Sequence, residues 1–319
     1  MRTRLTELLG VEHPVMLAGM GGVAYHQLVA AVSEAGGFGC FGASTMSGPQ
    51  LETELAAARE RTTKPFGVDL LTALPAELEA NVDRLIAGGA TAFVAGLGVP
   101  RDVIDTCHRH NVLVGSIGGK VRHAIAAVEA GCDFVIAQGT EAGGHTGFIA
   151  TMALVPQVVD AVEGRVPVVA AGGIADGRGL AAALVLGADG VWVGTRFIGT
   201  PEARTVAGYK EAVVRSAEDD TVITRSYSGK PMRAIRNEWT QRFEEHPEQL
   251  QPFPVQLGYS IDEGAFHLGG DATTPGVDPA IEGYPAGQVV GAITELVPAG
   301  VLVQRFVDEA ERAIANAPR

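Results

Sequence analysis

A glycine loop that carries a histidine directly follows an apolar segment near the middle of the chain. The segment Asp133–Ala137 has the composition of a strand buried on both faces, and it runs into QGTEAGGHTG at residues 138–147. The four glycines of this loop allow left-handed backbone or close approach to a ligand. His145 is thereby placed at the carboxyl end of a strand, where parallel α/β proteins keep their chemistry. The alternative is an ordinary turn with a solvent-exposed histidine.

Two more glycine motifs follow the next two apolar segments. They read AAGGIADGRG at residues 170–179 and VGTRF at residues 193–197. In barrels, the loops after the seventh and eighth strands often bind phosphate through backbone amides. We expect such amides from Gly172, Gly173, Gly194 and Thr195, with the Thr195 hydroxyl as a further donor. The alternative is that these glycines only form tight turns.

Three other side chains near these loops have open roles. Glu141 could orient His145 or cap the turn in which both lie. Tyr25 and His26 follow the first apolar segment and could line the site.

Apolar segments alternate with amphipathic ones through residue 215, and this rhythm predicts the fold. The expected strands are Val15–Ala18, Phe38–Gly42, Phe66–Leu71, Ala92–Leu97, Val112–Ile117, Phe134–Ala137, Val166–Ala171 and Val191–Phe197. The expected helices are His26–Ala35, Gln50–Arg61, Ala76–Ala87, Val103–Arg109, Val121–Ala130, Ala153–Val162, Gly179–Leu186 and Ala203–Arg215. Alternating units of this kind pair in parallel through right-handed crossovers. Eight of them predict an α/β fold of the (β/α)₈ TIM-barrel type.

The rhythm stops after residue 215, which suggests three regions. We expect a barrel core over residues 1–217, a lid or insertion at its mouth over 218–300, and a C-terminal helix over 301–319 that packs on the barrel. Within the last two regions, Ala286–Ile293 and Val301–Ala315 have helical patterns.

Composition excludes several classes of protein. The net charge is −13 over 319 residues and no lysine–arginine cluster occurs, which argues against nucleic-acid binding. No apolar run reaches the roughly 18 residues of a membrane span, and the N-terminus lacks the apolar core of a signal peptide. Cys40, Cys107 and Cys132 lack metal-ligand spacing and are expected to be buried thiols, which favours the cytoplasm. No metal site is expected.

The three glycine motifs, together with AGQVVGAI at residues 286–293, resemble the nitronate monooxygenase (2-nitropropane dioxygenase-like) family of FMN-dependent TIM barrels. They are also similar to the related flavin-dependent enoyl-acyl-carrier-protein reductases. PFGVDLL (65–71) and MRAIRNEWT (232–240) fit the same group, and the second is closer to the reductases. The resemblance extends from Pro14 to about Ile314.

This resemblance assigns roles to particular residues. It places Gly172, Gly173, Gly194 and Thr195 at the FMN phosphate and His145 as catalytic base or substrate-orienting group. The positions that match those around the flavin ring are Met20, Asp69, Gln138, Gly143, Gly144 and Gln288. Two positions depart from the family. Leu17-Ala18 stands where Gln-Gly is common, and Asp69 stands where asparagine is common. A carboxylate near the flavin disfavours an anionic reduced ring unless it is protonated or hydrogen-bonded.

The resemblance implies two candidate reactions. The first is the oxidation of alkyl nitronates or nitroalkanes with O₂ to a carbonyl compound and nitrite. The second is an NADH- or NADPH-dependent reduction of an enoyl or other acyl thioester, carried on coenzyme A (acyl-CoA) or on acyl carrier protein. Arg233 and Arg236 could then meet a phosphate, or they could form ordinary lid salt bridges. A flavin-binding subunit without activity is a third alternative. The partners would be a small-molecule substrate and O₂, and a homodimer is compatible with the sequence.

Overall fold

Eight parallel strands close into a barrel, as the alternating pattern predicts. The computed structural model describes residues 1–72, 77–96, 98 and 100–318. Its barrel strands are β1 (Val15–Leu17), β2 (Gly39–Gly42), β3 (Phe66–Leu71), β4 (Ala92–Gly96), β5 (Leu113–Gly118), β6 (Phe134–Gln138), β8 (Val168–Ala171) and β9 (Gly190–Val193). Their order is β1-β9-β8-β6-β5-β4-β3-β2, and a bridge between Met16 and Phe38 joins the two ends. The expected strand end Leu97 and helix start Ala76 lie outside the described residues.

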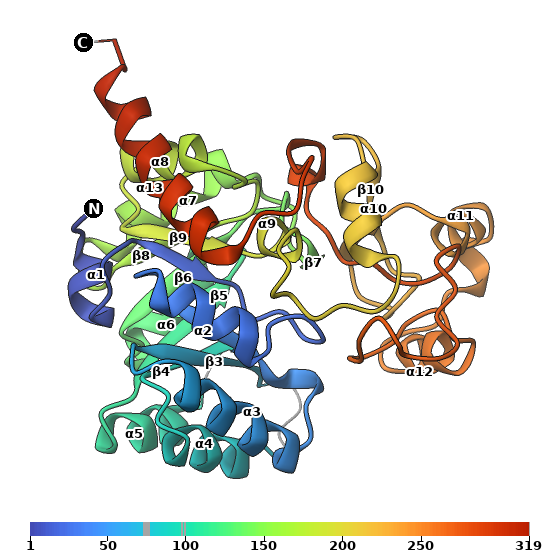
Figure 1. Ribbon diagram of the computed structural model, residues 1–319, viewed down its shortest axis with the longest axis horizontal. Helices are drawn as coiled ribbons and strands as arrows, with labels where there is room; N and C mark the ends of the chain where they lie inside the picture. Colours follow the sequence, from blue (N-terminus) through green and yellow to red (C-terminus); the bar gives the residue numbers. More distant parts are fainter. Residues whose placement is uncertain (73–76, 97, 99, 319) are drawn as a thin grey trace.

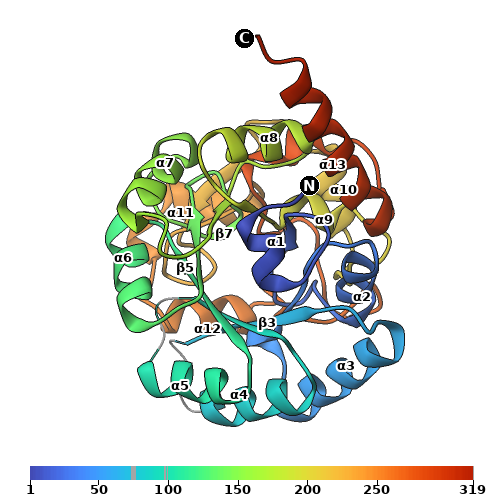
Figure 2. The same cartoon turned by 90° about the vertical axis from the view of Figure 1, so that its left-hand side faces the viewer.

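The helices form a ring around these strands (Figure 2). They are α2 (His26–Glu34), α3 (Gly48–Arg61), α4 (Leu78–Ala87), α5 (Arg101–Arg109), α6 (Val121–Ala130), α7 (Thr151–Val162), α8 (Gly177–Val185) and α13 (Ala299–Ala315). The eighth place in the ring belongs to α13, which packs against α8 and α2. The expected eighth helix, Ala203–Arg215, is therefore wrong in this role. Only α10 (Tyr209–Arg215) forms there, and it packs against α9 (Thr195–Ile198) and the 3₁₀ turn η4 (Gln288–Ala292).

Alternate strand residues fill the barrel interior, while the others pack against the helices. The interior cluster includes Phe38, Cys40, Val94 and Trp192. The helix α1 (Arg4–Leu9) adds Leu5 and Leu9 to this cluster, and both side chains are buried. A side chain at Gly190 would collide with Leu5, so α1 closes the end of the barrel where the strands begin. At the opposite end, where the strands finish, the loops that follow the strands form the mouth of the barrel.

Residues between α10 and α13 form a lid with a small core of its own. Two antiparallel strands, β10 (Thr221–Thr224) and β11 (Met232–Ile235), are followed by α11 (Glu238–Glu245), the 3₁₀ turn η3 (Pro247–Gln249) and α12 (Val255–Asp262). Their apolar side chains form a separate cluster: Tyr227, Met232, Ala234, Trp239, Phe243 and Ala265. In Figure 1 the lid lies to the right of the barrel, at the end opposite α1. The segment expected to be helical at Ala286–Ile293 contains only the short turn η4.

A third strand of the lid sheet comes from the barrel. The two residues of β7 (Gly144–His145) pair with β11 in antiparallel register, Met232 opposite His145 and Arg233 opposite Gly144. No strand is expected there from the sequence, because two residues carry no periodicity. The pairing connects the histidine loop to the lid.

Other expectations concern the cysteines and membrane spans. Cys40, Cys107 and Cys132 are buried and form no disulfide, so their expected burial is confirmed. Among the described residues, no helix has the length and apolar character needed to cross a bilayer.

The packing of α13 on α8 gives a first prediction. A methyl group at Gly177 would lie 2.4 Å from both the Phe306 carbonyl oxygen and the Glu309 Cβ. We expect Gly177→Ala to lower the free energy of unfolding by about 1–3 kcal/mol, because backbone must shift to admit it. Gly258→Ala is the matched control, since no atom lies within 4 Å of its added methyl group. Urea denaturation measures both, and an equal effect of the two substitutions would contradict the close packing.

Candidate functional site

Small residues surround the end of the barrel where the strands finish. By strand alternation, five of the inward positions at this level carry small residues, namely Ala18, Gly42, Gly96, Ala171 and Gly194, while Leu71, Ile117 and Gln138 carry larger ones. None of these five residues sends a large side chain across the mouth. The large interior side chains, such as Phe38 and Trp192, come from positions nearer the starts of their strands. At these five positions a flat ligand would meet backbone rather than long side chains.

Two loops at this mouth present free backbone amides. Gly172 and Gly173 follow β8 with φ of 94° and 75°, values that favour glycine. Gly194 and Thr195 follow β9 and begin α9. In the described part of the chain, the amide hydrogens of these four residues have no hydrogen-bond acceptor. The Thr195 Oγ1 accepts from the Gly287 amide at 2.9 Å, which leaves the hydroxyl hydrogen available. The four amides can therefore bind an anion such as a phosphate group.

The histidine loop, the β8 loop and the C-terminal segment lie against one another. A methyl group at Gly143 would meet Ala286 and Gly287 backbone atoms at 2.7 Å, so glycine is required for this contact. The Gln288 amide donates to the Glu141 carbonyl at 3.0 Å, while the Gln288 residue is exposed. An added Cβ at Gly172 would lie 2.9 Å from the Gly139 carbonyl oxygen of the histidine loop. The structure thus brings together three motifs that are far apart in the sequence.

Gln138 and Met20 lie at two other points of the mouth. The Gln138 Nε2 donates to the His145 carbonyl at 2.9 Å, which fixes the loop that carries the histidine. Met20 lies beside Gly194, where an added Cβ would be 3.4 Å from its sulfur. Gly144 has φ of 70°, and a Cβ there would point into open space. Glycine at this position therefore serves the backbone conformation.

The His145 ring is bound on one side by the lid. Its Nε2 lies 2.9 Å from the Ser228 Oγ, and Ser228 is buried. The Nδ1 atom has no hydrogen-bond partner among the described residues. Although solvent reaches this residue, surrounding protein atoms desolvate the ring, and the Lys230 charge adds to this effect. Both lower the pKa of His145 below its ordinary value. Because the Ser228 hydroxyl donates to the Lys230 carbonyl, its oxygen can accept from Nε2–H, and in this tautomer the Nδ1 lone pair is free to take up a proton.

Glu141 caps a helix and does not contact His145. Its carboxylate accepts from the Thr151 amide at 2.9 Å and from the Thr151 hydroxyl at 2.8 Å. Thr151 is the first residue of α7, where a carboxylate is favoured by the helix dipole. Of the two roles left open by the sequence, the structure shows a capping role, but at the start of α7 rather than within the turn.

Asp69 points into the barrel from β3 and is 9% exposed. It packs against Gly19, where an added Cβ would lie 2.7 Å from the Asp69 Oδ2. Desolvation raises the pKa of Asp69 from its ordinary value of 3.8 to about 8. The carboxyl group is therefore mainly protonated at neutral pH.

Comparison with known proteins agrees with this geometry. The family model for nitronate monooxygenase matches residues 2–88 and 78–309. The chain belongs to the nitronate monooxygenase family. A Staphylococcus saprophyticus protein described as a "probable nitronate monooxygenase" is 38% identical, over 80% of this chain and 84% of its own.

Two solved structures are similar along nearly their whole length. FabK from Thermotoga maritima has a TM-score of 0.87 and 33% identity, covering 99% of this chain and 98% of its own. A nitroalkane oxidase from Streptomyces ansochromogenes has a TM-score of 0.85 and 31% identity, covering 98% and 99%. The chain is an oxidoreductase of this family.

Several residues near the mouth do not line it. Tyr25 is buried beneath the Arg204 guanidinium, and the His26 Nδ1 pairs with Glu54 at 2.6 Å. Arg233 donates to the Thr140 carbonyl at 3.0 and 3.1 Å, and Arg236 pairs with Glu244 at 2.6 Å. All four have structural partners.

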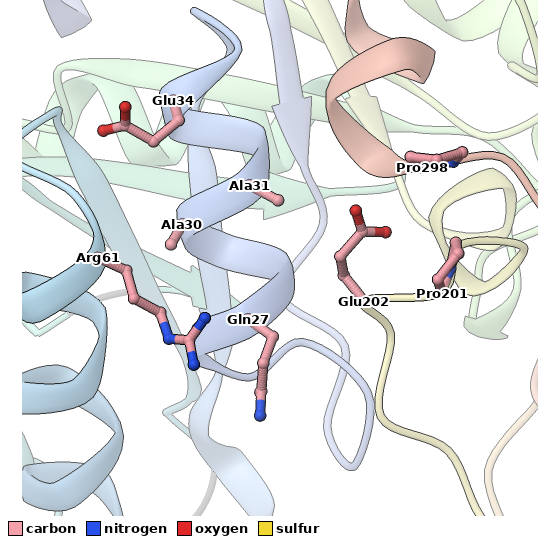
Figure 3. Close-up of a pocket in the computed structure, with 8 residues that line it drawn as sticks. All are labelled: Gln27, Ala30, Ala31, Glu34, Arg61, Pro201, Glu202 and Pro298. Atoms are coloured by element: carbon pink, nitrogen blue, oxygen red, sulfur yellow. The ribbon is translucent and has the colours of Figure 1, made fainter.

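A groove of about 510 Å³ lies on the outside of the barrel, along α2 (Figure 3). It is lined by Gln27, Ala30, Ala31, Glu34, Arg61, Pro201, Glu202 and Pro298. Both acids of this lining are already engaged: Glu34 accepts from the Thr62 hydroxyl, and Glu202 accepts from the Ala299 amide at the start of α13. This groove shares no residue with the loops at the mouth.

Sequence reasoning missed Ser228 and Lys230. Both belong to the turn between β10 and β11, some 83 positions from His145 in the case of Ser228. The alternating MRAI segment of β11 was a usable strand signal, but nothing in the sequence indicates that β7 is its partner.

The cap formed by Glu141 gives a second prediction. We expect Glu141→Ala to lower the free energy of unfolding by about 1–2 kcal/mol, because the Thr151 donors lose their acceptor. The NMR titration of the His145 ring should stay unchanged. Glu129→Ala, an exposed glutamate on α6, is the control and should change stability by less than about 0.5 kcal/mol. A displaced His145 titration in Glu141→Ala would assign Glu141 the orienting role.

Proposed function

We propose that this protein is an FMN-dependent nitronate monooxygenase, which oxidises alkyl nitronates or nitroalkanes with O₂ to a carbonyl compound and nitrite. The observation that carries the proposal is the His145 ring at the mouth, with Nε2 bound to Ser228 and Nδ1 free. The family match and the similar nitroalkane oxidase structure support the same reaction.

The mouth fits the proposed cofactor. The free amides of Gly172, Gly173, Gly194 and Thr195 would hold the FMN phosphate. Small inward residues and the open space beside Gly144 would accommodate the flat ring. Met20, Asp69, Gln138, Gly143 and Gln288 would surround it. FMN, when bound, accepts electrons from the substrate and passes them to O₂.

His145 would act on the substrate in its neutral form. A nitroalkane must lose a proton from carbon to become a nitronate, and a positioned base accelerates that loss. The Nδ1 atom is the available nitrogen, and Ser228 at Nε2 fixes the ring orientation. Lys230 adds positive charge near the ring, which would favour an anionic nitronate. Gln138 keeps the loop in place through the His145 carbonyl.

An NAD(P)H-dependent reductase of an acyl thioester is the second candidate, and the similarity to FabK favours it. Its support within the chain is weaker, because Arg233 and Arg236 are bound to Thr140 and Glu244. Neither guanidinium is left free for a carrier phosphate.

Anaerobic mixing separates these two candidates. We expect the FMN-loaded protein to lose its flavin absorbance when an alkyl nitronate is added without O₂. NADH and NADPH alone should leave the absorbance unchanged. Bleaching by a nicotinamide and not by nitronate would replace the proposal with the reductase.

The role of His145 gives a third prediction. We expect His145→Ala to retain FMN but to lose turnover of neutral nitroalkanes by about 10²–10⁴-fold, the usual contribution of a positioned base. Preformed nitronates should be affected much less, since their proton is already lost. His110→Ala is the control: this histidine follows α5, at the end of the barrel away from the mouth. Equal losses on nitroalkane and nitronate would contradict the role of His145 as a base.

The charge of Lys230 gives a fourth prediction. Because this charge lowers the pKa of His145, Lys230→Gln should raise it. The acidic limb of the kcat/KM profile for neutral nitroalkanes should then move to higher pH, by a few tenths to about one unit. Lys64→Gln removes a lysine paired with Glu12 at the surface and should leave the limb in place. An unmoved limb in Lys230→Gln would show that this profile does not report His145.

A further inference from the structure

Asp69 is the one Asp, Glu, Lys or Arg residue within the eight barrel strands as the structure describes them. Every other residue of these strands is apolar, glycine, serine or glutamine. A charged group in such a core is costly unless it is paired or neutralised. Its presence there calls for a physical explanation.

The carboxyl group has no partner that would stabilise its charge. Asp69 makes no hydrogen bond or ion pair with any residue in the described ranges. By register it lies between Gly42 on β2 and Val94 on β4, and Gly19 covers its side chain. A buried carboxyl group so isolated is more stable with its proton.

The groups around Asp69 do not supply another charge. The β2 strand contributes the Cys40 thiol, whose own pKa is raised well above its ordinary value by burial and by Asp69. The β4 strand contributes Val94, and the loop after β1 contributes Gly19 and Met20. Cys40 therefore stays neutral over the pH range in which Asp69 changes its state.

Asp69 lies immediately below the mouth. The next inward residue on β3, Leu71, is 38% exposed, and Gly42 and Gly96 on the flanking strands have no side chains to cover the carboxyl group. The carboxyl group of Asp69 is thus a polar group that the barrel interior offers to a ligand at the mouth, on the β3 side. His145 reaches the same mouth from the lid side, through β7.

We propose that Asp69 binds the FMN ring from the barrel side as a protonated acid, so that the protein holds FMN more weakly as Asp69 ionises. This inference rests on the proposed function. A neutral carboxylic acid can donate one hydrogen bond, whereas a carboxylate can only accept. Ionisation would therefore remove a donor and leave a buried negative charge without a partner. At neutral pH the protonated acid can donate a hydrogen bond, as the amide of an asparagine would. At higher pH the carboxylate cannot donate one.

The first test measures FMN binding to the apoprotein, and the quenching of FMN fluorescence reports the bound fraction. Between about pH 7 and about pH 9 we expect the wild-type Kd to rise by about tenfold, as the protonated fraction of a group with pKa of about 8 falls. Asp69→Asn keeps a neutral donor and should have a nearly constant Kd over this range. Asp219→Asn, an exposed aspartate, should behave as the wild type.

The outcomes of this titration are distinct. FMN uptake with the same pH dependence in Asp69→Asn as in the wild type would overturn the inference alone. No FMN uptake at any pH, the wild type included, would overturn the proposed cofactor and this inference with it.

A second measurement uses the apoprotein and needs no FMN. The pKa of Asp69 is higher in the folded state than its ordinary value of 3.8, so the folded protein retains a proton that the unfolded chain loses. Stability from this proton is complete below about pH 4 and is lost as pH rises through about 8. We expect the melting temperature of Asp69→Asn to exceed that of the wild type increasingly as pH rises over this interval. A constant difference would overturn the protonated state on which the inference depends.

Discussion

The pairing of β7 with β11 is the interaction on which the candidate site depends. Two residues of the histidine loop, Gly144 and His145, form a sheet edge with Met232 and Arg233 of the lid. This brings Ser228 and Lys230 to the His145 ring, although they lie more than 80 positions away. Glycine is needed at 144 because the backbone there has φ of 70°. Without this pairing, the ring would lose its contact with Ser228 and the Lys230 contribution to its lowered pKa, which adds to that of desolvation.

The lid occupies a long insertion between α9 and α13, and the position of α13 in the barrel explains this insertion. The last helix of the barrel ring comes from the C-terminus, so the lid is inserted before the ring is complete. The returning segment is bound to the mouth by Gly287, whose amide donates to Thr195, and by Gln288, whose amide donates to Glu141. The segment that leads into the last barrel helix therefore also forms the side of the candidate site that comes from the C-terminal part of the chain. Figure 1 shows α13 beside α8, with the lid on the other side of the mouth.

The sequence predicts the barrel because its signals are local and repeated. Eight apolar segments with helical spacers between them identify the strands, and glycines after β6, β8 and β9 mark the mouth. The eighth helix is misassigned since α10 and α13 both have amphipathic patterns, and only packing against α8 and α2 distinguishes them. Ser228 could not be found, because a buried serine in a turn carries no periodic signal and its partner is set by long-range pairing.

One physical effect, desolvation, acts in opposite directions on the two acid–base groups of the mouth. It lowers the pKa of His145 and raises that of Asp69, because burial disfavours the charged form of each. Near neutral pH the mouth thus holds a base without its proton and an acid with its proton. Although the chain has a net charge of −13, these two groups add no negative charge to the candidate site near neutral pH. Lys230 adds a positive charge near the His145 ring, which would favour an anionic ligand there.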